Sequence, residues 1–226
     1  MMEGQGPPPP LVKEKNFPPL PSFCCVGPCF YHDITVEIPM ESQRTCRIMF
    51  HLWQFYVFTL FFNCITTLAA LCIGYEGGGE MFGLSLVFLV LFTPLSFLFW
   101  YRSIYKALKS DSSFSYMMFF FLFTAQIIVV FIFCLGISAT AGWINALAIA
   151  NSNKEGKTGV SVMFFISAAL FTLLCLLQVL VLRKIHRHYR SSGASFEGAK
   201  NEFAQEGARA AADVVVPRND PNIGQA

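Results

Sequence analysis

Four long apolar runs, separated by short polar segments, dominate the pattern of this chain. They cover residues 51–74, 81–101, 115–137 and 160–182, and none has an Asp, Glu, Lys or Arg in its interior. A helix of about 20 apolar residues is long enough to cross the hydrocarbon core of a bilayer. The pattern therefore predicts an all-α membrane protein, folded as a bundle of four transmembrane helices.

The polar flanks divide the rest of the chain. Residues 1–50 form a proline-rich head, which we expect to be largely disordered because proline runs are stiff, solvated and unable to form a core. The head has no short apolar stretch followed by a cleavage site, so the first run is expected to act as its own insertion signal. Residues 51–182 form the membrane domain, and residues 183–226 form a tail that is basic at first and then disordered.

The distribution of positive charge predicts the orientation. Cytoplasmic loops of membrane proteins carry an excess of Lys and Arg. Of the sixteen Lys and Arg residues, only Lys154 and Lys157 lie between the third and fourth runs, and none lies in the 75–80 turn. Both termini and the 102–114 connection are therefore predicted to be cytoplasmic.

Two features modify the predicted helices. Pro94 lies inside the second run, where it removes one helical hydrogen bond and should bend the helix before Trp100. The segment 136–150 is apolar but too short to cross a membrane again, and it is predicted to be an interfacial or re-entrant element on the external side.

The connection from Trp100 to Tyr116 carries the candidate site. As a helix, it places Tyr101, Ile104 and Tyr105 on one face, with Arg102, Lys106 and Lys109 in one stripe beside them. Such a basic amphipathic helix can lie among lipid head groups, and each cation gains about 1 kcal/mol near an anionic leaflet. The alternative is a loop whose charges only fix the topology. The predicted lipid-binding residues are Trp100, Tyr101, Arg102, Ile104, Tyr105, Lys106 and Lys109.

Composition and charge limit the other classes of function. The net charge of +2 is too small to suggest a nucleic-acid partner, and the spans lack the ionisable residues of ion-coupled transporters. The sequence has no intramembrane carboxylate or histidine cluster and no glycine-rich phosphate loop, which are features that would indicate an enzyme. No catalytic activity and no cofactor are therefore expected. The alternative function is a small uncoupled membrane pore or transporter, and measuring the conductance of the purified protein in liposomes would test for a pore. Its polar lining would be Asn63, Thr66, Gln126 and Gln178.

Three cysteines lie close together in the head. Cys24, Cys25 and Cys29 lack the paired spacing of a structural zinc site, and no metal site is expected. Cysteines beside apolar residues near a membrane are typical acceptors of S-acylation, which is the hypothesis here, with unmodified thiols as the alternative. A zinc ion lost on changing all three to Ser would contradict it.

Four blocks of this sequence resemble the secretory carrier-associated membrane proteins. The resemblance covers roughly residues 16 to 205, in order. The blocks are NFPPLP, GPCFYHD, FTPLSFLFWYRSIYKALKSDSSFSYMMFFF and HRHYRSSGASFEGAKNEF.

The resemblance implies four spans with cytoplasmic ends in the trans-Golgi network, recycling endosomes, secretory vesicles and plasma membrane. It also implies a role in exocytosis and endocytic recycling, with trafficking or fusion proteins as partners and phosphoinositide binding by the segment from Trp100 to Lys109. Homo-oligomerisation stays open.

The chain departs from the family pattern in two ways. Phe99 and Ser103 stand where relatives usually have Cys and Pro. The loss of the proline should make this segment more continuously helical than in its relatives. The head has no Asn-Pro-Phe motif, so the chain resembles the short form of the family, and recruitment of endocytic adaptors through that motif is not implied.

The predicted orientation can be tested by cysteine labelling in intact cells. A cysteine introduced at Gly78 should react with an impermeant reagent added outside, whereas one at Ser110 should react only after permeabilisation. Labelling of the Ser110→Cys variant from outside, or no labelling of the Gly78→Cys variant, would contradict the predicted orientation.

Overall fold

The structure of the protein, a computed structural model, describes residues 31–137 and 139–191, together with residues 197–198, 200–201, 203–205 and 207–208. Within these residues the chain is helical, with turns and bends between the helices and no strand. The elements are α1 (Ile34–Glu37), α2 (Met40–Cys72), α3 (Gly78–Ser96), the π-helical turn η1 (Phe97–Tyr101), α4 (Arg102–Ser110), α5 (Ser113–Leu135), α6 (Trp143–Ala150) and α7 (Lys157–Ser191).

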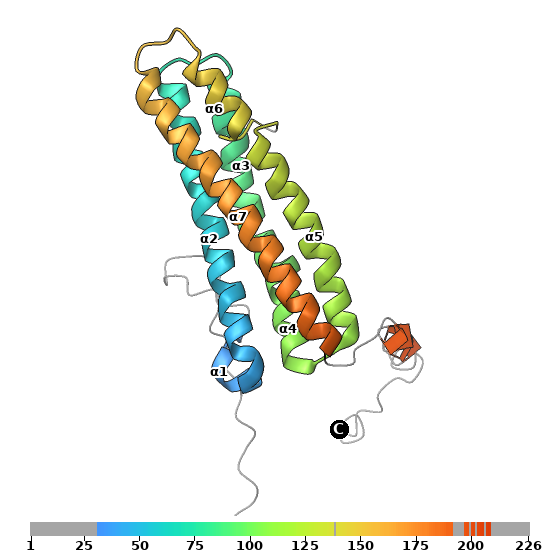
Figure 1. Ribbon diagram of the computed structural model, residues 1–226. Coiled ribbons are helices and arrows are strands. Elements are labelled where there is room, and N and C mark those ends of the chain that lie inside the picture. The colour runs from blue at the N-terminus through green and yellow to red at the C-terminus, as the bar shows by residue number, and fades with distance from the viewer. Residues whose placement is uncertain are drawn as a thin grey trace, which may run out of the picture.

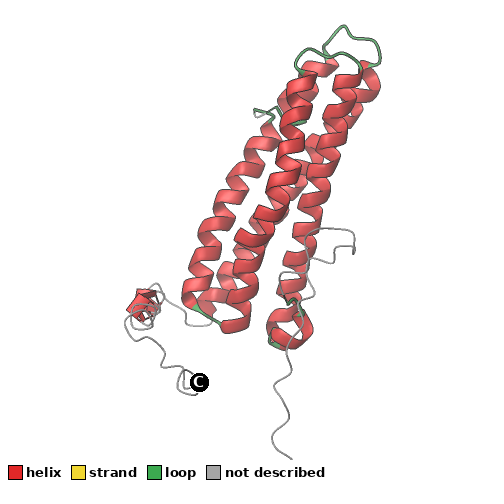
Figure 2. Cartoon of the chain, turned by 180° about the vertical axis from the view of Figure 1, so that it is seen from behind, coloured by secondary structure: helices red, strands yellow, loops and turns green. Residues whose placement is uncertain are grey.

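Four helices are long and apolar enough to cross a membrane, which confirms the predicted fold class. They are α2, the continuous helix α3–η1–α4, α5 and α7, and they pack side by side as a bundle (Figure 1). The turn between α2 and α3 and the loop between α6 and α7 lie at one end (Figure 2). We call the opposite end, formed by α1, α4, the start of α5 and the last turns of α7, the basic end. Its cations include Arg102, Lys106, Lys109, Arg183, Lys184, Arg187 and Arg190.

Two helices extend beyond the predicted spans. The sequence predicts a largely disordered head up to residue 50, but α1 and the first turns of α2 lie within it. These turns bury Ser42, Cys46 and Met49, spaced at helical intervals, so the core-facing stripe of α2 begins before the apolar run does. In the same way, α7 continues past residue 182 and buries Ile185.

The distortion predicted after Pro94 takes the form of the π-helical turn η1. Pro94 has no N–H to donate to the preceding turn, and the chain enters η1 three residues later. Here the N–H of Arg102 donates to the carbonyl of Phe97, five residues back. A π turn contains one more residue than an α turn, so it resets which side of α4 faces the bundle.

Polar side chains in the bundle pair both between helices and within them. The hydroxyl groups of Thr67 on α2 and Ser85 on α3 lie 2.6 Å apart, and the Trp53 indole N–H donates to Ser96 Oγ at 3.0 Å. Thr66 instead donates to the carbonyl of Phe62 in its own helix. A Thr hydroxyl can donate a hydrogen bond to a carbonyl in the preceding turn of its own helix, and residue type alone does not show when it does so.

The segment predicted as interfacial or re-entrant contains a tight loop and the short helix α6. The Asn63 side-chain oxygen accepts a hydrogen bond from the Ala141 N–H at 2.8 Å, which ties this loop to α2. Asn145 donates to the carbonyls of Gly136 and Thr140. Gly142 packs so closely on the end of α5 that a Cβ there would lie 2.5 Å from the carbonyl oxygens of Phe133 and Cys134. Its depth in a membrane stays a prediction.

Gly142→Ala should destabilise the protein, because the added methyl group meets backbone rather than a movable side chain. Overpacking of this kind costs about 1–3 kcal/mol. The melting temperature of the purified protein in detergent measures the effect. Gly83→Ala is the matched control, because a Cβ at Gly83 meets nothing within 4 Å and Ala favours a helix. Equal melting temperatures for the two variants would contradict the tight packing.

Candidate functional site

The apolar side of η1 and α4 faces the inside of the bundle. Trp100, Tyr101, Ile104 and Tyr105 are all buried, and Trp100 packs against Phe123 of α5 with ring centroids 5.1 Å apart. The structure thus places these four predicted lipid contacts against protein. An amphipathic helix can bury its apolar face in either environment, and here neighbouring helices provide it.

The three predicted cations lie on the other side of α4. Arg102 is half-buried, whereas Lys106 and Lys109 are exposed. The periodicity therefore separates the charged stripe from the apolar face as predicted. Whether this stripe binds lipid stays a prediction, but the geometry leaves that role to the cations rather than the aromatic rings.

A cluster of rings fixes α4 to the segment before α1. The His32 ring lies 5.4 Å from Phe50, 5.7 Å from Tyr101 and 5.1 Å from Tyr105, measured between centroids. Its Nε2 is 2.6 Å from the Tyr101 hydroxyl oxygen. Burial is the main cause that lowers the pKa of His32, against the opposing charges of Asp33 and Glu37. The neutral ring is therefore the form that fits this cluster.

Glu37 makes a second connection between α1 and α4. The Tyr105 hydroxyl donates to Glu37 Oε2 at 2.8 Å, and Lys109 Nζ lies 2.8 Å from Glu37 Oε1. The Glu37 side chain is only 6% exposed, and Lys109 is 49% exposed. A buried carboxylate is stable only when it is paired and hydrogen-bonded, and these two groups meet that need. Lys109 is thus committed to a partner within the chain.

Sequence reasoning did not identify His32 and Glu37 as partners of α4. They lie about 70 residues away along the chain, and no local periodicity connects them. The one signal available was the block GPCFYHD, which contains His32 and resembles the same family as the α4 block. The structure shows that these two blocks are in contact.

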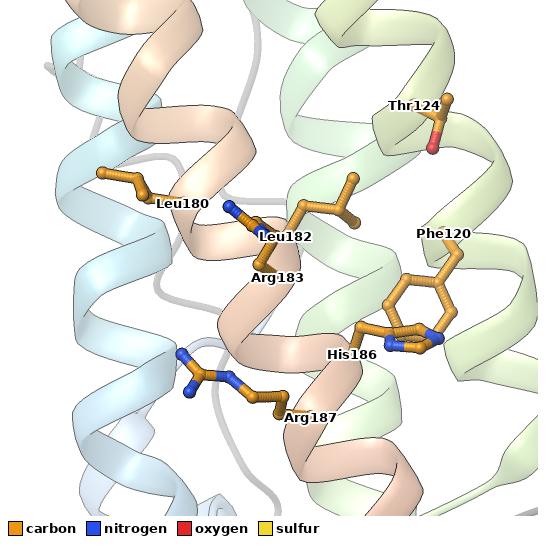
Figure 3. Close-up of a pocket in the computed structure, with 7 residues that line it drawn as sticks. All are labelled: Phe120, Thr124, Leu180, Leu182, Arg183, His186 and Arg187. Carbon is orange, nitrogen blue, oxygen red and sulfur yellow. The ribbon is translucent and has the colours of Figure 1, made fainter.

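The second corner of the basic end joins α5 and α7. Tyr116 and Tyr189 have ring centroids 5.3 Å apart, and Phe120 meets the His186 ring edge-on at 5.6 Å. Next to these rings, a cavity of about 690 Å³ lies along α5 and α7 (Figure 3). Its lining consists of Phe120, Thr124, Leu180, Leu182, Arg183, His186 and Arg187.

The side chains assigned to an alternative pore are all buried in the bundle. Asn63 binds the loop before α6, and Thr66 binds its own helix. The Gln126 side-chain nitrogen and both polar atoms of Gln178 have no hydrogen-bond partner among the described residues. The cavity described above does not include any of these side chains. A pore stays an alternative that this arrangement does not specifically favour.

The cysteines assigned to S-acylation, Cys24, Cys25 and Cys29, lie outside the described residues, so that assignment stays a prediction. Within the part of the chain that the structure describes, no three His, Cys, Asp or Glu side chains form a group that could hold a metal ion.

The four helices that are long and apolar enough to cross a membrane define a multi-pass helical membrane protein. The chain belongs to the SCAMP family, whose profile matches residues 14–192. It is 43% identical over 196 residues to human secretory carrier-associated membrane protein 2, covering 86% of this chain and 58% of the relative.

Two mouse relatives show similar identity. Secretory carrier-associated membrane protein 3 is 44% identical over 195 residues, covering 85% of this chain and 54% of the relative. Secretory carrier-associated membrane protein 4 is 41% identical over 194 residues, covering 85% and 82%. The chain thus spans little more than half the length of the first two relatives. The comparison with solved structures finds no significant match.

Docking of the segment 31–38 onto α4 should weaken in mild acid. A histidine whose pKa is lowered by burial takes up a proton more readily when the segment is undocked. The docked state is therefore at its most stable above the ordinary pKa of 6.5, and it loses stability as the pH drops below that value. Hydrogen exchange of residues 31–38, corrected for intrinsic rates, should show less protection at about pH 5.5 than at about pH 7.5. His32→Gln should remove most of this difference, and equal protection of the native chain at both values would contradict it.

Proposed function

We propose that this protein is a multi-pass component of post-Golgi carriers that acts in exocytosis and endocytic recycling. Its proposed compartments are the trans-Golgi network, recycling endosomes, secretory vesicles and plasma membrane, where it works with trafficking or fusion proteins. Support comes from its membership of the SCAMP family, whose named relatives are secretory carrier-associated membrane proteins.

We further propose that α4 contacts anionic phosphoinositide through its charged stripe. The observation that carries this proposal is the fixed orientation of α4: its aromatic side is buried, while Arg102 and Lys106 face away from the core. The Lys106 amine is exposed and has no acidic partner among the described residues. Because packing already fixes the helix that carries these cations, binding a phosphate does not require the backbone of α4 to become ordered.

The fixed orientation changes the expected contribution of each cation. Lys109 is paired with Glu37, so it should contribute less to the attraction than the exposed Lys106. At about 1 kcal/mol per cation, Arg102 and Lys106 together contribute about 2 kcal/mol, or about thirtyfold in affinity. Since screening limits the reach of exposed charges to about 8 Å at physiological salt, binding should also weaken as salt rises.

The double variant Arg102→Ala/Lys106→Ala should bind phosphoinositide about thirtyfold more weakly than the native chain. The measurement is titration of short-chain phosphatidylinositol bisphosphate into protein held in phosphatidylcholine nanodiscs, repeated across a salt series. Lys154→Ala/Lys157→Ala removes the same charge from the opposite end of the bundle and should change little.

The same variants test the trafficking proposal in cells. Depletion of the protein should slow both the release of a secreted reporter and the return of an internalised receptor. The native chain and the opposite-end control should restore these rates, and the α4 variant should not. Equal lipid binding by all variants would leave α4 as a topology signal, whereas unchanged secretion and recycling after depletion would remove the trafficking role.

A further inference from the structure

The cavity along α5 and α7 combines two kinds of surface. Its polar part comes from Arg183, His186 and Arg187, which are all exposed on the last turns of α7. Its apolar part comes from Phe120, Leu180 and Leu182. Figure 3 shows the charged side chains along one stretch of α7, with Leu180 and Thr124 farther from the basic end.

The charged part is suited to an anion. Arg183 and Arg187 are four residues apart, so their side chains lie one above the other on the same side of the helix. Neither α5 nor α7 contains an Asp or Glu, and neither guanidinium has an acidic partner among the described residues. A guanidinium group can bind either a phosphate or a carboxylate through two parallel hydrogen bonds. The amine of a lysine does not provide this geometry.

The position of the cavity indicates where this phosphate comes from. Leu182 is the last residue of the apolar run and Arg183 the first cation after it, so the polar and apolar parts meet where hydrocarbon gives way to head groups. If a phosphate bound here belonged to a phospholipid, its glycerol and acyl chains would extend along the apolar side. The polar groups of a soluble anion or an acidic peptide would make no favourable contact with the apolar side chains of Leu180 and Phe120.

We propose that this groove binds an anionic glycerophospholipid from the leaflet at the basic end. The phosphate lies between Arg183 and Arg187. The glycerol and the first acyl carbons lie against Leu180, Leu182 and Phe120. The volume of about 690 Å³ accommodates a head group and the start of its chains. This site is separate from the charged stripe of α4, and either can exist without the other.

Photo-cross-linking can locate the lipid. Protein in nanodiscs is exposed to phosphatidylinositol 4-phosphate or phosphatidylcholine carrying the same diazirine-labelled acyl chain, and adducts are mapped to peptides by mass spectrometry. The anionic probe should label the α5 and α7 stretches around Thr124 and Leu180 at much lower concentration than phosphatidylcholine does. Arg183→Ala/Arg187→Ala should raise the concentration for half-maximal labelling about thirtyfold.

Matched variants separate this site from general attraction. Lys184→Ala/Arg190→Ala removes the same charge from the same helix outside the groove and should leave labelling nearly unchanged. Thr124→Trp keeps every charge but fills an exposed part of the groove, and it should also reduce labelling. Arg102→Ala/Lys106→Ala should leave labelling at the groove intact, which keeps failure of this proposal distinct from failure of the α4 proposal.

Three results would overturn the proposal. Equal labelling by both lipids would mean ordinary contact with surrounding lipid. An equal loss in the Lys184→Ala/Arg190→Ala variant would mean an unlocalised field of positive charge. Competition by soluble inositol phosphate as strong as that by unlabelled lipid would identify a phosphate site without a role for the acyl chain.

Discussion

The burial of the aromatic side of η1 and α4 is the interaction on which the basic end depends. Tyr101 packs against Phe50 and Trp53 of α2, and both Tyr101 and Tyr105 lie against His32 before α1. Each tyrosine also carries a hydroxyl that needs a polar partner. His32 and Glu37 supply these partners. One set of side chains thus provides apolar area and hydrogen bonds together, so α1, α2 and α4 are held as a unit. The cations of α4 are positioned as a consequence of this packing.

The fold was largely predictable from sequence because a membrane imposes simple requirements. A backbone in hydrocarbon must satisfy its own hydrogen bonds, so long apolar runs without charge have to be helices. The runs starting at residues 51 and 160 identified α2 and α7 correctly, but not where these helices begin and end. Those limits depend on buried residues such as Cys46 and Ile185, which lie in stretches that are polar on average.

The candidate site was less predictable, for a physical reason. The periodicity of Tyr101, Ile104 and Tyr105 defines an apolar face but does not say what covers it, since lipid and protein are both apolar. The answer depends on distant residues, including Phe123 on α5 and His32 before α1. The pairing of Lys109 with Glu37 is equally non-local, and it changes the role of a cation that looks equivalent to Lys106 along the chain.

The π-helical turn has a consequence for how this protein could tolerate change. An extra residue in one turn rotates everything after it by about 100° relative to a regular α-helix. Which side chains α4 presents to its surroundings is therefore decided one turn earlier, between Phe97 and Tyr101, and not within α4 itself. Insertion or deletion of a single residue there would exchange charged and aromatic positions without altering either. The orientation of α4 thus depends more on the number of residues between Phe97 and Tyr101 than on which residues they are.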